Sequence, residues 1–217
     1  MIVVADVQDI QYGLLESADL EELIELLADV FSRFDPPAAA AGLSFDDARA
    51  LVRLFAQRAP YDALTIVARE QSSGKLIGAM LTDDFATPPP GGVDNLSEHF
   101  HPIAALLDGL DEQYRKTRRV VPGEILHLFM LGVSPEFGGK GIAHTLVQLT
   151  LDNGKRNSYK TAITEATGNV SQHIFRKLGF IEQFCTAYKE FHYHGKQIFE
   201  TIVEHDAVIL MERKLDA

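Results

Sequence analysis

One stretch of the chain decides how the rest of the fold is interpreted: Val133-Ser134-Pro135-Glu136-Phe137-Gly138-Gly139-Lys140-Gly141-Ile142-Ala143. It follows a nearly continuous apolar run, residues 125–133, which is typical of a central strand buried on both faces. Apolar residues at helical spacing follow it, so the stretch connects a strand to a helix. Its glycines allow a tight turn whose backbone N–H groups converge, and the helix N-terminus adds a positive dipole. The stretch therefore suits a pyrophosphate, although its spacing matches neither the dinucleotide fingerprint nor a P-loop, and a glycine-rich turn without a ligand stays open as the alternative.

The flanking sequence predicts a single mixed domain. Apolar spacing indicates helices at 17–34, 44–55, 96–114, 142–149 and 170–178, and Asp35-Pro36-Pro37 is expected to end the first of them. Short apolar runs predict a β-hairpin at 63–81, a strand at 160–166, and two final strands at 181–191 and 201–213 joined through 194–196. The fold class is therefore α/β (α+β), with residues 1–217 forming one domain around a mixed central sheet of about seven strands flanked by helices.

Two motifs in this order resemble the GCN5-related N-acetyltransferases, the GNAT superfamily. The first matches the acyl-CoA motif at Val133, Pro135, Gly139, Gly141 and Ala143. The second is the helix that begins near Asn169 and ends in Phe175-Arg176-Lys177-Leu178-Gly179-Phe180. The chain departs from the family at Gly138, where an Arg or Gln is usual, so one side-chain contact to the pyrophosphate is missing. Against the family pattern, residues 93–119 form a helical insertion.

The resemblance implies acetyl-CoA as co-substrate, bound between two splayed central strands. The unpaired backbone of Leu131, Gly132 and Val133 would hold the pantetheine. The pyrophosphate would lie against Gly138, Gly139, Lys140, Gly141, Ile142 and Ala143, with Asn169 at the next helix also contacting the cofactor. A deprotonated amine would attack the thioester directly, in a ternary complex. A base is needed because an alkylamine, with a pKa near ~10.4, is mostly protonated at neutral pH.

Three residues are candidates for that base, and each also has a purely structural interpretation. Asp35 lies where arylalkylamine N-acetyltransferases carry a Glu-Pro-Leu segment, but an Asp-Pro turn explains it too. Glu124 precedes the buried strand and could equally be an exposed residue beside a Pro-Gly turn. His127, on that strand, resembles a histidine that passes protons in the same branch; alternatively it is a hydrogen-bonded core residue.

The general acid is less evident, because Phe175 occupies the usual tyrosine position and has no proton to donate. Ser171, one helical turn earlier, resembles a serine of the arylalkylamine branch, and helix capping is its structural alternative. Tyr188 and Tyr193 stay open as alternatives. Asp83 and Asp84 could attract a cationic acceptor, or form a turn at the end of a strand.

Composition limits the function classes. Asp and Glu number 31 against 20 Lys and Arg, for a net charge of -11, which argues against nucleic acid and anionic membranes as partners. One cysteine excludes an internal disulfide, and no signal or spanning segment is found, so we expect a cytoplasmic protein. No metal-ligand pattern is evident, so we expect no metal. We expect the protein to be a monomer or a homodimer. The expected activity is transfer of acetyl to a small primary amine. The alternatives are a protein or peptide N-acetyltransferase and a non-catalytic acyl-CoA sensor.

Overall fold

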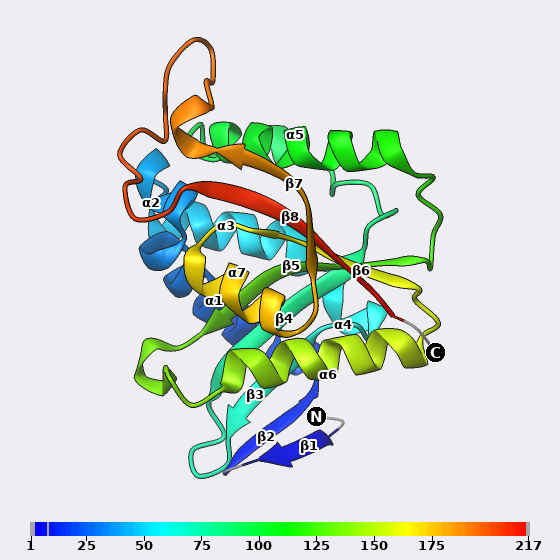
Figure 1. Cartoon of the computed structure of the whole chain (residues 1–217). Helices are drawn as coiled ribbons and strands as arrows, with labels where there is room; N and C mark the ends of the chain where they lie inside the picture. Colours follow the sequence, from blue (N-terminus) through cyan, green and yellow to red (C-terminus); the bar gives the residue numbers. More distant parts are fainter. Residues whose placement is uncertain (1–2, 8, 216–217) are drawn as a thin grey trace.

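The computed structural model describes residues 3–7 and 9–215, so residues 1–2 and 216–217 of the expected domain, and residue 8, lie outside it. Eight strands form one mixed sheet in the order β1-β2-β3-β4-β5-β6-β8-β7 (Figure 1). Only β5 and β6 pair in parallel. The strands are β1 Val3–Val7, β2 Ile10–Leu14, β3 Ile66–Glu70, β4 Leu76–Asp84, β5 Ile125–Val133, β6 Thr161–Ala166, β7 Ile181–Ala187 and β8 Ala207–Lys214.

Helices cover both faces of the sheet and bury a separate apolar cluster on each. One face carries α1 Leu20–Phe34, α2 Pro36–Ala41, α3 Phe45–Ala56 and α5 His101–Thr117; the other carries α6 Ile142–Arg156 and α7 Asn169–Lys177. The short helix α4, Ala59–Asp62, contacts β4, and single 3-10 turns occur at Ser17–Asp19, Val93–Asn95, Pro135–Phe137 and Tyr188–Glu190. None of the helices described is long and apolar enough to cross a membrane.

The centre of the sheet opens between β5 and β6. Their parallel register runs from Ile125 paired with Thr161 to His127 paired with Ile163. One residue further, the Thr164 hydroxyl donates to the carbonyl oxygen of Leu128 at 2.9 Å, and a bulge in the β4–β5 ladder falls at the same level. Because bulges bend the strand that carries them, β5 turns away from β6 beyond this point. The sequence prediction of splayed central strands is therefore confirmed.

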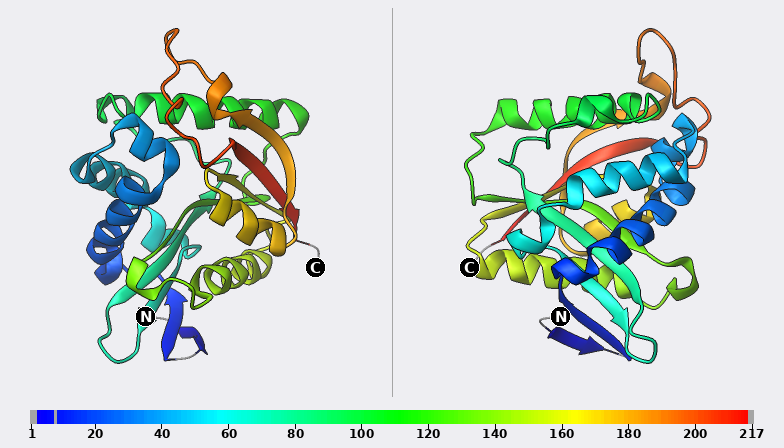
Figure 2. Two further views of the ribbon diagram at one scale, coloured as in Figure 1. Left: turned by 60° about the vertical axis from the view of Figure 1, so that its left-hand side comes forward. Right: turned by 180° about the vertical axis from the view of Figure 1, so that it is seen from behind.

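Two sequence predictions differ from the structure, one at the end of a helix and one in the C-terminal strands. Asp35-Pro36-Pro37 does end α1, but it also starts α2, because the Asp35 carboxylate caps the new helix and proline is tolerated in a first turn. At the C-terminus, β7 and β8 pair antiparallel as expected but are shorter than predicted. The residues between them project from the end of the molecule that carries α5 (Figure 2), and Tyr188, Phe191 and Phe199 form an aromatic cluster there instead of a ladder.

The eighth strand arises from the N-terminus. β1 and β2 form an edge hairpin that the sequence analysis did not predict. β1 is largely exposed, so it lacks the apolar alternation by which strands are recognised, and β2 contains Gly13. The predicted helical segment at 93–119 does contain helix, as the turn Val93–Asn95 and α5.

Candidate active site

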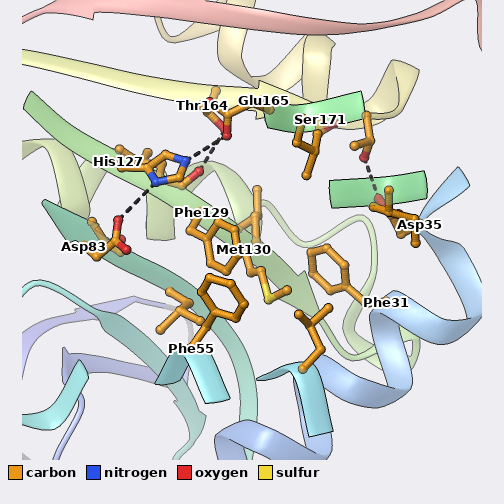
Figure 3. Close-up of a pocket in the computed structure, with 18 of the residues that line it drawn as sticks. Phe31, Asp35, Phe55, Asp83, His127, Phe129, Met130, Thr164, Glu165 and Ser171 are labelled. Carbon is orange, nitrogen blue, oxygen red and sulfur yellow. Dashed lines mark hydrogen bonds and ion pairs between the residues drawn. The ribbon is translucent and has the colours of Figure 1, made fainter. Parts of the chain in front are cut away.

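A cavity of about 660 Å³ continues from the open end of β5 and β6 into the space under α1, α3 and α5. Its middle is apolar and largely aromatic, with walls that include Phe31, Phe34, Leu51, Leu54, Phe55, Phe85, Leu107, Phe129 and Met130. Two groups of polar side chains lie on either side of this apolar middle. Figure 3 shows Asp35 and Ser171 at one end and Asp83, His127 and Glu165 at the other, with aromatic side chains between them.

The glycine-rich loop borders the open end of this cavity. Gly139 and Gly141 have φ of 75° and 77°, a left-handed conformation that favours glycine. The first helical bond of α6 runs from the Thr145 N–H to the Gly141 carbonyl, so the N–H groups of residues 142–144 have no intrahelical acceptor. Lys140 is exposed, with its ammonium 4.8 Å from the centre of the Phe137 ring. These groups together form a positively polarised surface suited to phosphate oxygens.

The residues expected to contact the cofactor lie in four places. Leu131, Val133 and Ala143 line the cavity itself. Gly132 faces α1, where a Cβ would come within 2.6 Å of a Leu27 methyl group, so a close backbone approach explains this glycine. Gly138, Gly139, Lys140, Gly141 and Ile142 form the loop and helix start beside the cavity. Asn169 begins α7, where its side-chain amide donates to the Glu204 carbonyl oxygen at 2.7 Å.

Asp35 is held in a fixed orientation at the junction of α1 and α2. Its Oδ1 accepts a 2.6 Å hydrogen bond from the Thr167 hydroxyl, and its Oδ2 accepts the Ala38 N–H at 3.0 Å. Burial of the carboxyl group raises its pKa above the usual value, while the two hydrogen bonds oppose that rise. A carboxylate with a raised pKa beside a cavity is suited to accept a proton.

Ser171 lies at the same end of the cavity as Asp35, in the first turn of α7 (Figure 3). Its hydroxyl donates to the Gly168 carbonyl oxygen at 2.9 Å and accepts the Gly168 N–H at 3.3 Å, so it caps the helix and also lines the cavity. Phe175 is buried against Phe180. Tyr188 donates its hydroxyl to the Thr167 carbonyl at 2.6 Å, and neither it nor Tyr193 is among the residues that line the cavity.

His127 is clamped between two carboxylates at the other end. Its Nδ1 is 3.1 Å from Asp83 Oδ1 and its Nε2 is 2.7 Å from Glu165 Oε2. Burial by itself lowers the pKa of this imidazole, but the charge of Glu165 and the hydrogen bonds to both carboxylates raise it well above the usual value. A carboxylate only accepts hydrogen bonds, so both ring nitrogens carry protons. His127 is therefore an imidazolium and cannot take a further proton in this arrangement.

Asp111 extends the cluster from α5. Burial and the nearby charge of Glu165 raise its pKa to about 8, although His127 and Arg115 oppose the rise. The pKa of Glu165 itself is lowered, because the charge of His127 and its hydrogen bond outweigh the effect of burial. Asp111 thus holds a proton that it shares with the Glu165 carboxylate at neutral pH.

Sequence reasoning noted Asp83 but missed Glu165 and Asp111. Each of these two residues has a sequence feature that could have marked it as a candidate. Glu165 is an acid in an otherwise apolar or neutral strand, next to the point where the strands separate. Asp111 lies at helical spacing from Leu107 and Tyr114, on the inward face of α5, where a solvated acid is not expected.

Glu124, by contrast, is not among the residues that line the cavity. It lies before the first residue of β5, at the closed end of the β5–β6 pair, and forms an ion pair with Lys160. Its backbone carbonyl accepts N–H groups of residues 160 and 161, so its position is set by strand pairing. The structure thus separates it from Asp35, His127 and Ser171, which all line one cavity.

Comparisons with known proteins agree on one fold. The model of the acetyltransferase (GNAT) family matches residues 21–180. The C-terminal condensation domain of Ebony, in complex with beta-alanyl-dopamine, is similar over 96% of this chain and 100% of its own, with a TM-score of 0.87 and 16% identity. Arylalkylamine N-acetyltransferase 2 from Aedes aegypti is similar over 96% of this chain and 100% of its own, with a TM-score of 0.81 and 22% identity. A polyamine N-acetyltransferase from Drosophila melanogaster is similar over 95% of this chain and 100% of its own, with a TM-score of 0.73 and 19% identity.

Proposed function

Because the chain belongs to the acetyltransferase (GNAT) family, we propose that it transfers the acetyl group of acetyl-CoA to a primary amine of a small molecule, by direct attack within a ternary complex. The observation that carries this proposal is the single cavity that joins the open β5–β6 strands to an acidic, aromatic-walled pocket. Its volume of about 660 Å³ falls in the range of small-molecule sites.

The residues present fit acetyl-CoA. The α6 N-terminus and the left-handed glycines supply N–H groups for the pyrophosphate, and Lys140 supplies a positive charge, in place of the side chain that is absent at Gly138. The backbone of Leu131 to Val133 lies on the side of β5 that has separated from β6, where it can hold the pantetheine. The bound co-substrate supplies the thioester whose carbonyl carbon the amine attacks.

Asp35 is the residue we assign as the base. It lines the cavity, its carboxylate is oriented by Thr167 and by the Ala38 N–H, and its raised pKa makes it a better proton acceptor than an exposed aspartate. Asp35 takes one proton from the ammonium form of the acceptor. The free amine then forms the C–N bond as the C–S bond breaks.

Ser171 is the group we assign to protonate the departing thiolate. Of the candidates Ser171, Tyr188 and Tyr193, only Ser171 is among the residues that line the cavity. Its hydroxyl is hydrogen-bonded to the Gly168 carbonyl, and rotation about the C–O bond redirects the proton towards the thiolate. The nitrogen then loses its second proton, which returns through solvent to the Ser171 oxygen, and Asp35 releases the first proton to solvent, so the products are a neutral amide, the free thiol and one proton.

The lining favours an amine that is cationic in solution and carries an apolar body. Carboxylates outnumber Arg58 and Arg115 on its walls, and aromatic rings form its middle. The similar structures include an arylalkylamine and a polyamine N-acetyltransferase, which supports acceptors of this kind.

The test is a panel of acceptors with acetyl-CoA and a thiol reagent that reports free CoA. The panel contains aryl and alkyl monoamines, diamines, a peptide with a free N-terminus and a blank without acceptor. We expect CoA release with one or more small amines and none with the peptide. Release with the peptide alone contradicts the small-molecule assignment. An upward shift of the melting temperature with acetyl-CoA but no release with any acceptor supports the sensor alternative.

A further inference from the structure

We propose that the Asp83–His127–Glu165–Asp111 cluster is a second cation-binding subsite, so that the acceptor is a dication: one end carries the amine that is acetylated, and the other carries an ammonium or guanidinium group. This inference rests on the proposed function and names the class of acceptor. It concerns the end of the cavity opposite to Asp35 and Ser171 (Figure 3).

Two carboxylate oxygens in this cluster, Glu165 Oε1 and Asp111 Oδ1, are buried and have no hydrogen-bond donor apart from the proton that the two acids share. The Glu165 side chain is only 5% exposed, and its other oxygen already accepts from His127. A buried carboxylate oxygen without a donor is costly, so the pair must share a proton or bind a cationic N–H donor. Both residues line the cavity, which gives such a donor access to them.

The charges around the cluster favour the cationic donor. Asp62, Asp84 and Asp108 line the same cavity in addition to the cluster acids. Of the cations, Arg115 lowers the pKa of Asp111 through its charge, but it makes its hydrogen bond outside the cluster: its guanidinium lies 3.9 Å from the centre of the Phe85 ring and donates to the Phe85 carbonyl oxygen at 2.7 Å. His127 is neutralised by Asp83 and Glu165. A bound ammonium replaces the proton between Asp111 and Glu165, and that proton leaves to water.

The spacing suits a molecule with an apolar linker. His127 and Leu131 lie on one strand and are separated by four residues, which corresponds to ~13 Å at the rise of a β-strand. The expected thioester lies at the Leu131 end. Between the two ends are Phe129, Met130 and Phe55, which bind methylene groups but offer no partner to a second charge (Figure 3).

A metal ion is a poor occupant of this subsite. In the part of the chain that the structure describes, no three or more His, Cys, Asp and Glu side chains are grouped so that they could hold a metal ion. Both nitrogens of His127 are committed to carboxylates and protonated, so the ring offers no lone pair.

The experiment compares α,ω-diamines of increasing length, and an aminoalkyl guanidine, with n-alkylamines of matched length. We expect kcat/KM to pass through a maximum with diamine length and to exceed that of the matched monoamine by about tenfold or more, because only the diamine makes a charged hydrogen bond to the subsite. Asp111→Asn and Glu165→Gln should remove most of that preference by raising KM for the diamine, with less than about threefold change for the monoamine, which makes no such bond.

Glu112→Gln is the matched control, because it removes an equal charge from α5 at an exposed position outside the cavity lining. It should leave the diamine preference unchanged. Two results would overturn the subsite without contradicting the proposed acetyltransferase activity. One is that the wild type acetylates matched monoamines as efficiently as diamines; the other is that Asp111→Asn affects both classes of amine equally. If the variants do not fold, the wild-type preference alone decides.

Calorimetry with CoA in place of acetyl-CoA separates this inference from the proposed function. Diamine binding that weakens about tenfold or more in Asp111→Asn supports the subsite, whether or not any acceptor is acetylated. If such binding is found but no acceptor is acetylated, the proposed function is wrong and the subsite is still supported. Absence of diamine binding by the wild type, at concentrations where monoamines are acetylated, overturns the subsite alone.

Discussion

Replacing Asp35 by asparagine removes the proposed base while it keeps the shape and most of the hydrogen bonding of the side chain. Asn is as good an N-cap as Asp, so its Oδ1 can still accept the Ala38 N–H that starts α2. The Thr167 hydroxyl can rotate to accept from the new amide. We therefore expect the free energy of unfolding to change by less than about 1 kcal/mol.

The catalytic effect should be much larger. A positioned general base contributes about 10²–10⁴-fold to the rate, so Asp35→Asn should lower kcat by ~100-fold or more, which equals ~2.7 kcal/mol of barrier. Acetyl-CoA affinity should not change, because the hydrogen bonds of Asp35 go to Ala38 and Thr167 and not to the glycine-rich loop. The assay is CoA release with a saturating amine, with thermal unfolding and acetyl-CoA titration of each variant.

The control is Asp29→Asn, which removes the same charge from α1 at an exposed site where Asp29 pairs with Arg33. It should leave kcat unchanged. If Asp35→Asn folds with wild-type stability and retains kcat within about threefold, the reasoning that makes Asp35 the base is refuted.

Three further predictions follow from individual groups. Thr167→Val removes a hydrogen bond that lowers the pKa of Asp35, so the acidic limb of the kcat/KM profile should move to higher pH; an unmoved limb contradicts the link. Gly141→Ala, at a φ of 77°, should destabilise the fold by ~1 kcal/mol and weaken acetyl-CoA binding in calorimetry, whereas Gly74→Ala, at a φ of 70° in an open turn, should cost the same stability without affecting binding. The raised pKa of Asp111, about 8, means that the folded state retains a proton that the unfolded chain has lost, so stability falls as the pH rises from ~4 towards ~8. Urea unfolding should show a smaller decline for Asp111→Asn, and parallel profiles would count against the shared proton.

The end of the site that we propose binds acetyl-CoA could be predicted from local sequence. The apolar run of β5, the glycines of the loop and the helical spacing of α6 are all contiguous, and each has a direct geometric consequence. Asp35 was also identified, because the segment after the first helix resembles the Glu-Pro-Leu segment of arylalkylamine N-acetyltransferases. Its partner Thr167 was not, because the two residues are distant in the chain and meet only when β6 and α1 are assembled.

The acidic cluster shows why the rest could not be predicted. Asp83 reaches His127 through the β4–β5 register, Glu165 through the β5–β6 pairing, and Asp111 through the position of α5 across the sheet. Each contact depends on sheet order, which local periodicity does not determine. Glu124 illustrates the converse: its place before a buried strand suggested a role in the site, but the parallel register places it at the closed end beside Lys160.

The most direct test of the central claim follows the acetyl group itself. Acetyl-CoA labelled at the carbonyl carbon is incubated with the protein and the amine that gives the fastest CoA release, and the products are analysed by mass spectrometry. Direct transfer predicts that the label appears in an amide of the amine, in an amount equal to the CoA released, and that no label is retained on the protein when the amine is omitted. Label that stays in acetyl-CoA, or that accumulates on the protein before the amine is added, would contradict the proposed reaction.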